Sequence, residues 1–228
     1  MVEKVIRPPT LTSAVADKIR EAIFRGDLQP GAPLREIELS KSLEISRGTV
    51  REALRILMDE GLINVETYRG AYVARLTPEK AKEIYTLRGV LEGYAVRLAL
   101  ENSAYTTMDF EILNELVNRM GELDDAGNLL KVLHTDMRFH MLICERSNHR
   151  LLLNVLGNLQ SQSMLFILNT KLYRSDSVRD DISHQAIIDA LRGGDPSIGE
   201  EIVRKHIYDT GIALLERMKV NDLERINV

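Results

Sequence analysis

The sequence of 228 residues contains one cysteine, no tryptophan and only five histidines. A lone cysteine, Cys144, excludes an intrachain disulfide and is typical of a protein in a reducing cytosol. No stretch approaches the roughly 18 to 20 consecutive apolar residues that a membrane-spanning helix needs. The first residues also lack the apolar segment of a signal peptide. We therefore expect a cytoplasmic protein that does not enter a membrane.

The sequence also lacks a net positive charge: it has 30 lysines and arginines and 34 aspartates and glutamates, which gives a net charge of −4. Residues 1–76 are nearly balanced, with 12 basic and 11 acidic side chains, and the remainder is acidic. Binding to nucleic acid would therefore rest on a local basic patch and not on bulk charge. The hydrophobic content of 44% and the length suit one large globular domain or two modest ones.

Residues 46–61 contain such a patch on a predicted helix. Ser46 suits the first position of that helix and Gly61 its end. Apolar residues recur at steps of three and four and predict a buried face, while arginines recur every four residues on another face. The apolar row is Val50, Ala53, Leu54, Leu57 and Met58, and the basic row is Arg47, Arg51 and Arg55. A helix of this kind suits the DNA major groove, although a basic stripe alone is more often a solvated surface.

The flanking segments favour the DNA-binding interpretation. Residues 34–43 predict a short helix, and the tight turn at 44–46 gives helix-turn-helix spacing. Residues 62–65 and 71–73 are strand-like and predict a two-stranded wing with its turn at 68–70. The candidate DNA-binding residues are Arg35, Ser46, Arg47, Thr49, Arg51, Arg69 and Gly70.

This stretch resembles the winged helix-turn-helix signature of GntR-type bacterial transcription regulators over roughly residues 10 to 75. The matching motif begins at Leu39, continues through the segments 46–47 and 50–54, Leu57 and the segment 60–63, and closes with Arg69-Gly70. Two departures stand out. Gly48-Thr49 replaces the Thr-Pro of many members, and Ile37 stands where some carry an arginine. The resemblance implies a double-stranded DNA operator, but one base contact is missing and the operator sequence cannot be carried over.

The rest of the chain is expected to be helical. Residues 1–9 predict a flexible arm, and residues 10–76 predict the DNA-binding domain. Thr77 begins a helical domain that extends over 77–228, because it can cap a helix whose first turn holds a proline and a glutamate. Six helices are predicted, at about 78–102, 106–126, 128–147, 149–172, 177–192 and 196–219. The predicted fold class is mainly α: a winged helix-turn-helix with a small β wing, followed by a six-helix bundle.

Ionisable residues interrupt the apolar rows of these helices. Asp136 and His140 lie four residues apart on one helix, while His184 and His206 fall on apolar rows of two others. Imidazoles with one carboxylate suit a divalent ion such as Zn, Ni or Mn better than Ca. The alternative is that each histidine is a core residue with its own hydrogen-bond partner.

A second resemblance bears on this choice. The segments 136–140, 148–151 and 184–195, with a later His206, resemble the effector-binding FCD domain of the FadR-like branch of GntR regulators. The six-helix count resembles its shorter, VanR-like form. Metal-binding members hold a divalent ion with matching residues, so the resemblance implies Asp136, His140, His184 and His206 as ligands. Ser183 stands where many relatives have glutamate.

Arg88 interrupts another apolar row. It either pairs with Glu92 one turn later or clamps the carboxylate of a small acid. The segment 87–95 resembles the first helix of the FCD domain, which favours the acid. In that case Arg88 lies in a ligand cavity, and three further polar residues are predicted to line it: Gln162, Ser163 and Asn169. His134 is expected at the surface or an interface, and Cys144 as a small buried residue.

Together these features predict a cytoplasmic, homodimeric, ligand-responsive repressor that binds a near-palindromic operator. A small carboxylate effector would bind beside the metal and modulate DNA binding. One rival interpretation is a metal-dependent enzyme of the helical domain fused to a DNA-binding module. No glutamate that could act as a general base lies near the ligands in sequence, so we expect no enzymatic activity. A purely structural metal is the third interpretation.

Overall fold

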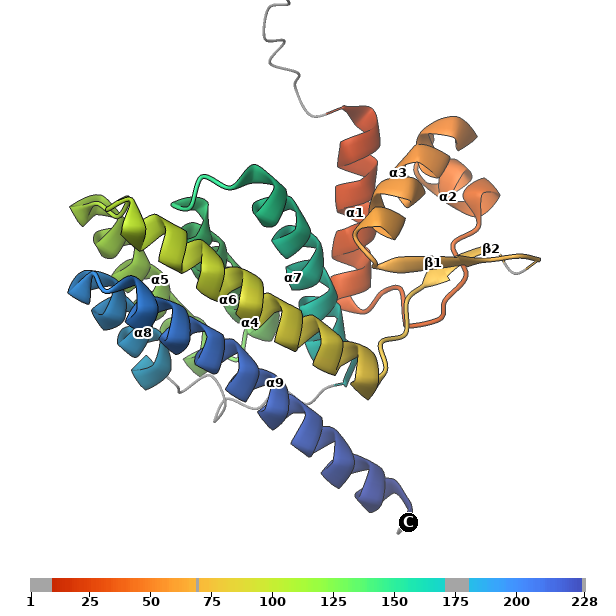
Figure 1. The fold of residues 1–228 in the computed structure, drawn as a ribbon. Coiled ribbons are helices and arrows are strands. Elements are labelled where there is room, and N and C mark those ends of the chain that lie inside the picture. The colour runs from red at the N-terminus through yellow and green to blue at the C-terminus, as the bar shows by residue number, and fades with distance from the viewer. Residues whose placement is uncertain (1–9, 69, 171–180, 227–228) are drawn as a thin grey trace, which may run out of the picture. The chain divides into compact units, whose positions relative to one another are not determined.

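The structure, a computed structural model, describes residues 10–68, 70–170 and 181–226 (Figure 1). The predicted arm at 1–9 and the predicted DNA contact Arg69 lie outside the described residues. The chain divides into two compact units, Met1–Arg75 and Leu76–Val228. The described residues form nine helices and one two-stranded sheet, which confirms the predicted fold class.

The N-terminal unit is a winged helix-turn-helix. Its elements are α1 (Leu11–Arg25), α2 (Glu36–Ser42), α3 (Arg47–Asp59), β1 (Ile63–Glu66) and β2 (Gly70–Val73). The two strands pair antiparallel, with Ile63 opposite Val73 and Glu66 opposite Gly70. Pro33 forms an isolated bridge with Tyr72, so the segment before α2 lies against the wing.

Helix α3 begins and packs as its sequence predicts. The Ser46 side chain caps its first turn by accepting a hydrogen bond from the Thr49 amide at 3.1 Å. Val50 and Leu57 are fully buried in the unit's core. The spacing predicts Met58 on the same face, but Met58 is 41% exposed. It follows Leu57 directly, and the roughly 100° between neighbouring helical residues turns it out of the core.

The C-terminal unit is an all-α bundle. Its helices are α4 (Pro78–Glu101), α5 (Thr107–Asp125), α6 (Leu129–Glu145), α7 (Arg150–Thr170), α8 (Asp181–Gly193) and α9 (Pro196–Ile226). Thr77 caps α4 as predicted, accepting a hydrogen bond from the Lys80 amide at 3.3 Å. No strand occurs in this unit between residues 76–170 or 181–226. α9 continues past the predicted end at residue 219.

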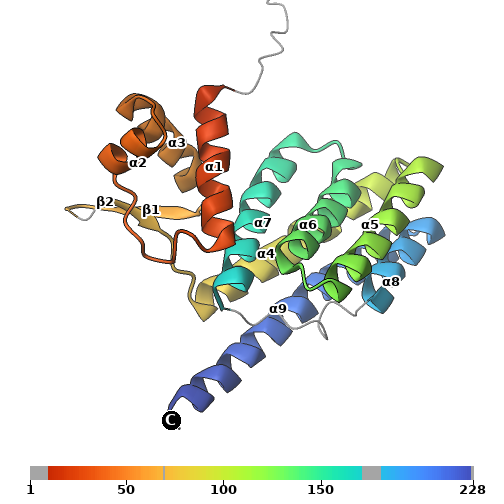
Figure 2. The ribbon, with the colours of Figure 1, turned by 180° about the vertical axis from the view of Figure 1, so that it is seen from behind.

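Helix α4 lies at the centre of the bundle and contacts α6, α7 and α9. It runs alongside α9 in both views (Figure 1 and Figure 2). Glycines permit this approach, because a Cβ atom on Gly89 or Gly93 would lie 3.2 or 3.0 Å from a backbone oxygen of α9. A buried polar residue on α4 can therefore contact side chains of several neighbouring helices.

Helix α7 has an unusually apolar composition, although polar residues interrupt its apolar stretches. Among the described helices only α7, over Arg150–Leu168, is long and apolar enough to cross a membrane, with a mean hydropathy of 1.3. The helix supplies Leu152, Leu156 and Leu165 to the core of the bundle, which accounts for this composition. It also carries the buried polar residues Gln160 and Ser163.

Candidate metal centre and DNA-binding surface

The predicted basic stripe lies on the surface of the N-terminal unit. Arg47 and Arg51 are both more than half exposed on α3. Arg51 makes a two-pronged ion pair with Glu36 of α2, with Nε and Nη2 at 2.9 and 2.8 Å from the two carboxylate oxygens. This pairing holds the pKa of Glu36 below its usual value. Exposed ion pairs contribute little to stability, so Arg51 can exchange Glu36 for a phosphate or a base.

Other predicted DNA-binding residues lie nearby. The hydroxyl groups of Ser46 and Thr49 are 2.8 Å apart at the start of α3. Arg35 and Gly70 line one open cavity of about 410 Å³ between the wing and α2. Glu36 also lines this cavity and could not be singled out from the sequence, where it is simply the acidic first residue of a helix. Apart from Arg69, which lies outside the described residues, the structure therefore places all the predicted contacts in this unit.

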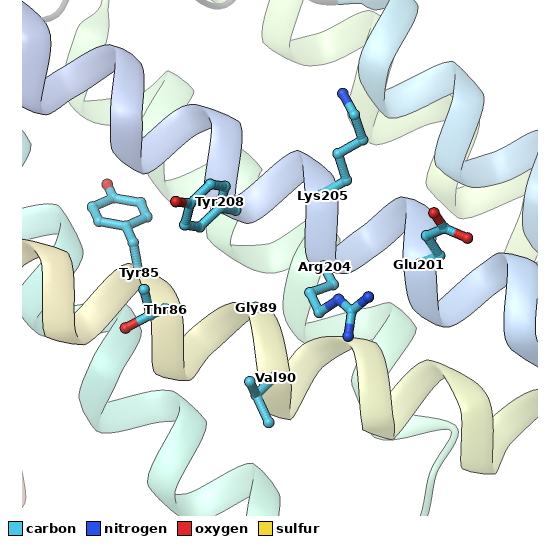
Figure 3. Close-up of a pocket in the computed structure, with 8 residues that line it drawn as sticks. All are labelled: Tyr85, Thr86, Gly89, Val90, Glu201, Arg204, Lys205 and Tyr208. Atoms are coloured by element: carbon cyan, nitrogen blue, oxygen red, sulfur yellow. The ribbon is translucent and has the colours of Figure 1, made fainter.

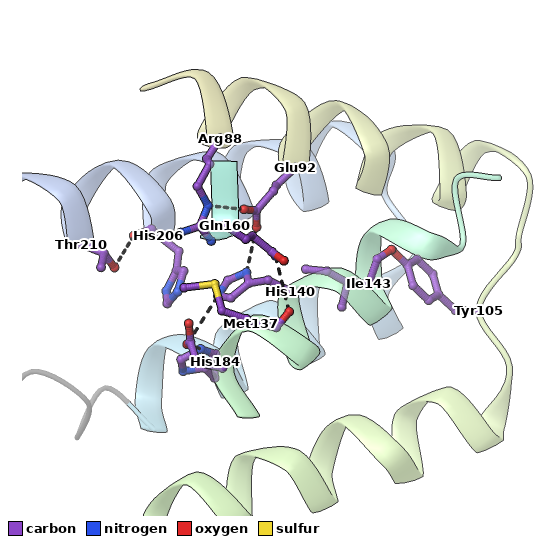
Figure 4. A network of polar contacts seen from close by, with 11 residues as sticks. Arg88, Glu92, Tyr105, Met137, His140, Ile143, Gln160, His184, His206 and Thr210 are labelled. Carbon is purple, nitrogen blue, oxygen red and sulfur yellow. Dashed lines mark hydrogen bonds and ion pairs between the residues drawn. The ribbon is translucent and has the colours of Figure 1, made fainter. Parts of the chain in front are cut away.

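The three inward histidines meet inside the helical unit (Figure 4). His140 of α6 and His184 of α8 are 1% and 6% exposed, and His206 of α9 is half-buried. One ring nitrogen from each lies within 4.8 Å of the others. The ring centroids are 4.8 to 5.5 Å apart. Three helices thus bring three imidazoles into one cluster.

Asp136 completes this cluster. Its Oδ1 atom lies 3.0 Å from Nε2 of His184 and 3.7 Å from Nε2 of His140. Burial alone would raise the pKa of Asp136, but its interaction with the nearby His140 and its hydrogen bond with His184 bring that pKa far below its usual value. Burial, together with His184 and His140, lowers the pKa of His206 well below its ordinary value. A carboxylate and a neutral imidazole are the forms that bind a metal ion.

Arg88 and Glu92 form a buried ion pair beside the histidines. They are 2% and 0% exposed, and Arg88 Nε donates to Glu92 Oε1 at 2.8 Å. The other Glu92 oxygen, Oε2, lies 2.8 Å from Nδ1 of His140. The alternative pairing of Arg88 with Glu92 is therefore present. Glu92 is absent from the predicted cluster because its sequence spacing indicates only a pair with Arg88, one turn earlier on α4.

The remaining predictions for this unit have mixed outcomes. Ser163 is fully buried, Gln162 is half-buried, and the side chain of Asn169 lies outside the described residues. The buried glutamine of α7 is Gln160, which the sequence pattern does not single out and whose amide is 3.4 Å from the Met137 carbonyl oxygen. His134 is exposed and Cys144 fully buried, as predicted. Burial raises the pKa of the Cys144 thiol, which makes it a packing residue.

The cluster has the composition of a transition-metal site. Three imidazoles and one carboxylate are the donor set that Zn and its neighbours prefer, and Nε2 of His140 and His184 both face Asp136. A winged helix-turn-helix joined to a helical bundle with such a cluster defines a class of protein: a DNA-binding regulator with a separate sensing domain.

Comparisons with known proteins identify the family. Residues 11–73 match the model "Bacterial regulatory proteins, gntR family", and residues 83–209 match the FCD domain. The chain belongs to the GntR family of transcriptional regulators and carries an FCD domain. Regulators of this family bind DNA operators and commonly act as dimers, and FCD domains are known to bind metals.

Three relatives illustrate the match. The "Probable D-xylose utilization operon transcriptional repressor" of Paenarthrobacter nicotinovorans is 32% identical over 201 residues, covering 87% of this chain and 86% of that protein. The gluconate operon transcriptional repressor of Bacillus licheniformis is 30% identical over 187 residues, covering 79% and 75%. Among solved structures, Escherichia coli McbR/YncC superposes with a TM-score of 0.77 at 25% identity, covering 91% and 97%.

Proposed function

We propose that this protein is a cytoplasmic, ligand-responsive repressor whose helical domain binds a divalent metal and a small carboxylate. The observation that carries the proposal is the convergence of His140, His184 and His206 with Asp136 inside the bundle. The exposed arginines of α3 provide the DNA-binding surface. We infer repression because two relatives are named as operon repressors. The acid modulates DNA binding if it prefers one arrangement of the dimer.

The proposed metal ligands are Asp136, His140, His184 and His206, with Zn, Ni or Mn as the ion. A bound ion would supply positive charge that attracts the carboxylate of the effector. Arg88 would hold the acid from a second side, and Gln162, Ser163 and Asn169 would line the cavity. The hydrogen bond to Glu92 uses Nε of Arg88. The Nη atoms form the outer edge of the planar guanidinium fork, the part that suits a carboxylate.

A metal-dependent enzyme is the rival interpretation. Among the described residues, Glu92 is the one carboxylate beside the cluster other than Asp136. It pairs with Arg88 and contacts His140. A general base must be free to accept a proton from a bound water or substrate. The pairing of Glu92 therefore supports a sensing role over a catalytic one.

The regulatory function can be tested by first selecting the operator. Selection of duplex DNA from a random library by the full-length protein is expected to yield a near-palindrome with two matching half-sites. The affinity for that DNA is then measured with Zn, Ni or Mn and a panel of carboxylates. Failure to enrich any sequence, or an affinity that no combination of metal and acid alters, contradicts the proposal.

Replacement of Arg51 by alanine tests the DNA-binding surface. We expect the affinity for the selected operator to fall roughly ten- to hundredfold, because a guanidinium that reads a base contributes discrimination of this size. Arg55→Ala is the matched control, since Arg55 lies one turn further along α3 and pairs with Glu52 of its own helix. Fluorescence anisotropy at fixed salt measures both variants. Equal affinity of the parent and Arg51→Ala places the contact elsewhere.

The proposed homodimer has a candidate interface on α4. Leu87, Val90 and Tyr94 recur at steps of three and four and are 44%, 56% and 45% exposed. Beside them, α9 exposes Tyr208, and an open groove of about 430 Å³ lies between the two helices (Figure 3). Its charged lining has both signs: Glu201, Arg204 and Lys205. A charged patch that pairs with its own copy avoids like-charge repulsion when it carries both signs, and this patch does, so we propose a second copy of this chain as its occupant.

Val90→Glu tests this interface. We expect the parent to sediment as a dimer at micromolar concentration and the variant as a monomer, because each copy would bury a carboxylate where the interface holds an apolar side chain. Met108→Glu is the matched control, since Met108 is 62% exposed on α5, away from the groove. A dimeric Val90→Glu protein, or a monomeric parent, would show that α4 is not the interface.

A further inference from the structure

Glu92 is a fully buried charge that contacts two functional candidates at once. Each of its oxygens faces a different group: Oε1 accepts from Arg88 Nε at 2.8 Å, and Oε2 lies 2.8 Å from His140 Nδ1. The contact with His140 has the distance of an ion pair but not the angles of a hydrogen bond. Glu92 Oε2 and His140 Nδ1 both lack a hydrogen-bond partner among the described residues.

We propose that Glu92 is a positioning residue that aims His140 at the metal and sets the charge of the effector. This inference rests on the proposed metal-binding function. With Nδ1 directed at Glu92, the other nitrogen of His140, Nε2, faces Asp136 at 3.7 Å. Histidines that bind metals usually donate their second N–H to a carboxylate, which fixes the tautomer and strengthens the metal bond. Glu92 has the burial and the distance for this role.

The same residue determines the charge of the cluster. Among the described residues, Arg88 and Glu92 cancel each other, so Asp136 leaves the cluster with one negative charge when the imidazoles are neutral. A divalent ion converts this to one positive charge. A single carboxylate then neutralises the site, whereas a dicarboxylate would leave an excess buried charge, which is unfavourable. The effector is therefore an acid with one carboxylate, and its other groups are neutral.

The contact with His140 is tested by the metal affinity of Glu92→Gln. We expect a 10- to 100-fold loss relative to the parent, measured by competition with a chromophoric chelator. The matched control is Glu101→Gln, because Arg97 and Glu101 form the same i, i+4 pair on the exposed face of α4. If the parent takes up metal and Glu92→Gln binds it equally well, the positioning role is wrong and the proposed function stands. A parent that takes up no metal overturns both.

A double variant separates the orientation of His140 from the net charge of the cluster. It also provides a second test in case Glu92→Gln alone fails to fold. Arg88→Met/Glu92→Gln removes one charge of each sign, so the net charge of the cluster is that of the parent. We expect it to show the same 10- to 100-fold loss of metal affinity, because His140 still lacks its carboxylate. Parent-like metal affinity in the double variant overturns the positioning role. Circular dichroism establishes that each variant is folded.

The charge of the effector is tested with matched acids on the metal-loaded proteins. Butyrate and succinate have the same number of carbons but one and two carboxylates. In a thermal-shift assay, the parent is expected to be stabilised more by butyrate and similar monocarboxylates than by succinate and similar dicarboxylates. Glu92→Gln, with one more positive charge, is expected to move toward dicarboxylates. A parent that prefers dicarboxylates, or a preference that Glu92→Gln leaves unchanged, contradicts the inference while the metal site itself remains.

Discussion

Replacing His184 and His206 together by alanine is expected to abolish metal binding. The two residues come from α8 and α9, and their rings lie 4.8 Å apart, so the double variant removes two of the four donors. Asp136 and His140 would remain, both on α6, and two donors make a weak site for a first-row metal. A ligand at 100 times its Kd stabilises a protein by about 2.7 kcal/mol. The variant should lose the whole of this metal-dependent stabilisation.

The measurement is elemental analysis together with thermal unfolding, each with and without added Zn, Ni or Mn. His134→Ala is the matched control, because His134 lies on α6 beside the proposed ligands but is exposed. DNA binding should persist in the double variant, since the winged helix-turn-helix is a separate unit with its own core. Metal content equal to that of the parent would show that the histidines are core residues and not ligands.

The winged helix-turn-helix and the bundle helices could be predicted because their signals are local. Ser46 and Thr77 cap helices through hydrogen bonds to amides three residues away, and such bonds follow from the sequence spacing alone. The position of Met58 was the exception. A row of three- and four-residue steps predicts one face but not its width, and the buried face of α3 ends at Leu57.

The candidate metal centre could be predicted only in part. Asp136 and His140 share a face by helical geometry, whereas their closeness to His184 and His206 depends on how three helices pack. Glu92 escaped prediction for the same reason. Its spacing from Arg88 suggested an ordinary surface pair, and nothing in the sequence shows that its second oxygen reaches a histidine of α6. Contacts between ionisable groups on different helices depend on how the helices pack, and the periodic pattern of a sequence does not show that packing.

The burial of this pair gives the second large expected effect, a loss of stability when Arg88 alone is replaced by methionine. The change removes the guanidinium that pairs with Glu92, whose carboxylate is 0% exposed. Breaking a buried ion pair from one side costs about 3–5 kcal/mol, whereas replacing both partners with neutral groups of similar volume is often close to neutral. Arg88→Met should therefore destabilise the full-length protein by about 3–5 kcal/mol, and Arg88→Met/Glu92→Gln should recover most of that loss.

Urea unfolding of the full-length protein, followed by circular dichroism without added metal, measures both variants and the single Glu92→Gln. The double-mutant cycle gives the coupling between the two residues. Arg97→Met is the matched control, because Arg97 pairs with Glu101 at the same spacing on the exposed face of α4 and should change stability little. If Arg88→Met and Arg97→Met unfold at the same urea concentration, the Arg88–Glu92 pair is solvated in solution. Glu92 could not then set the charge of the cluster.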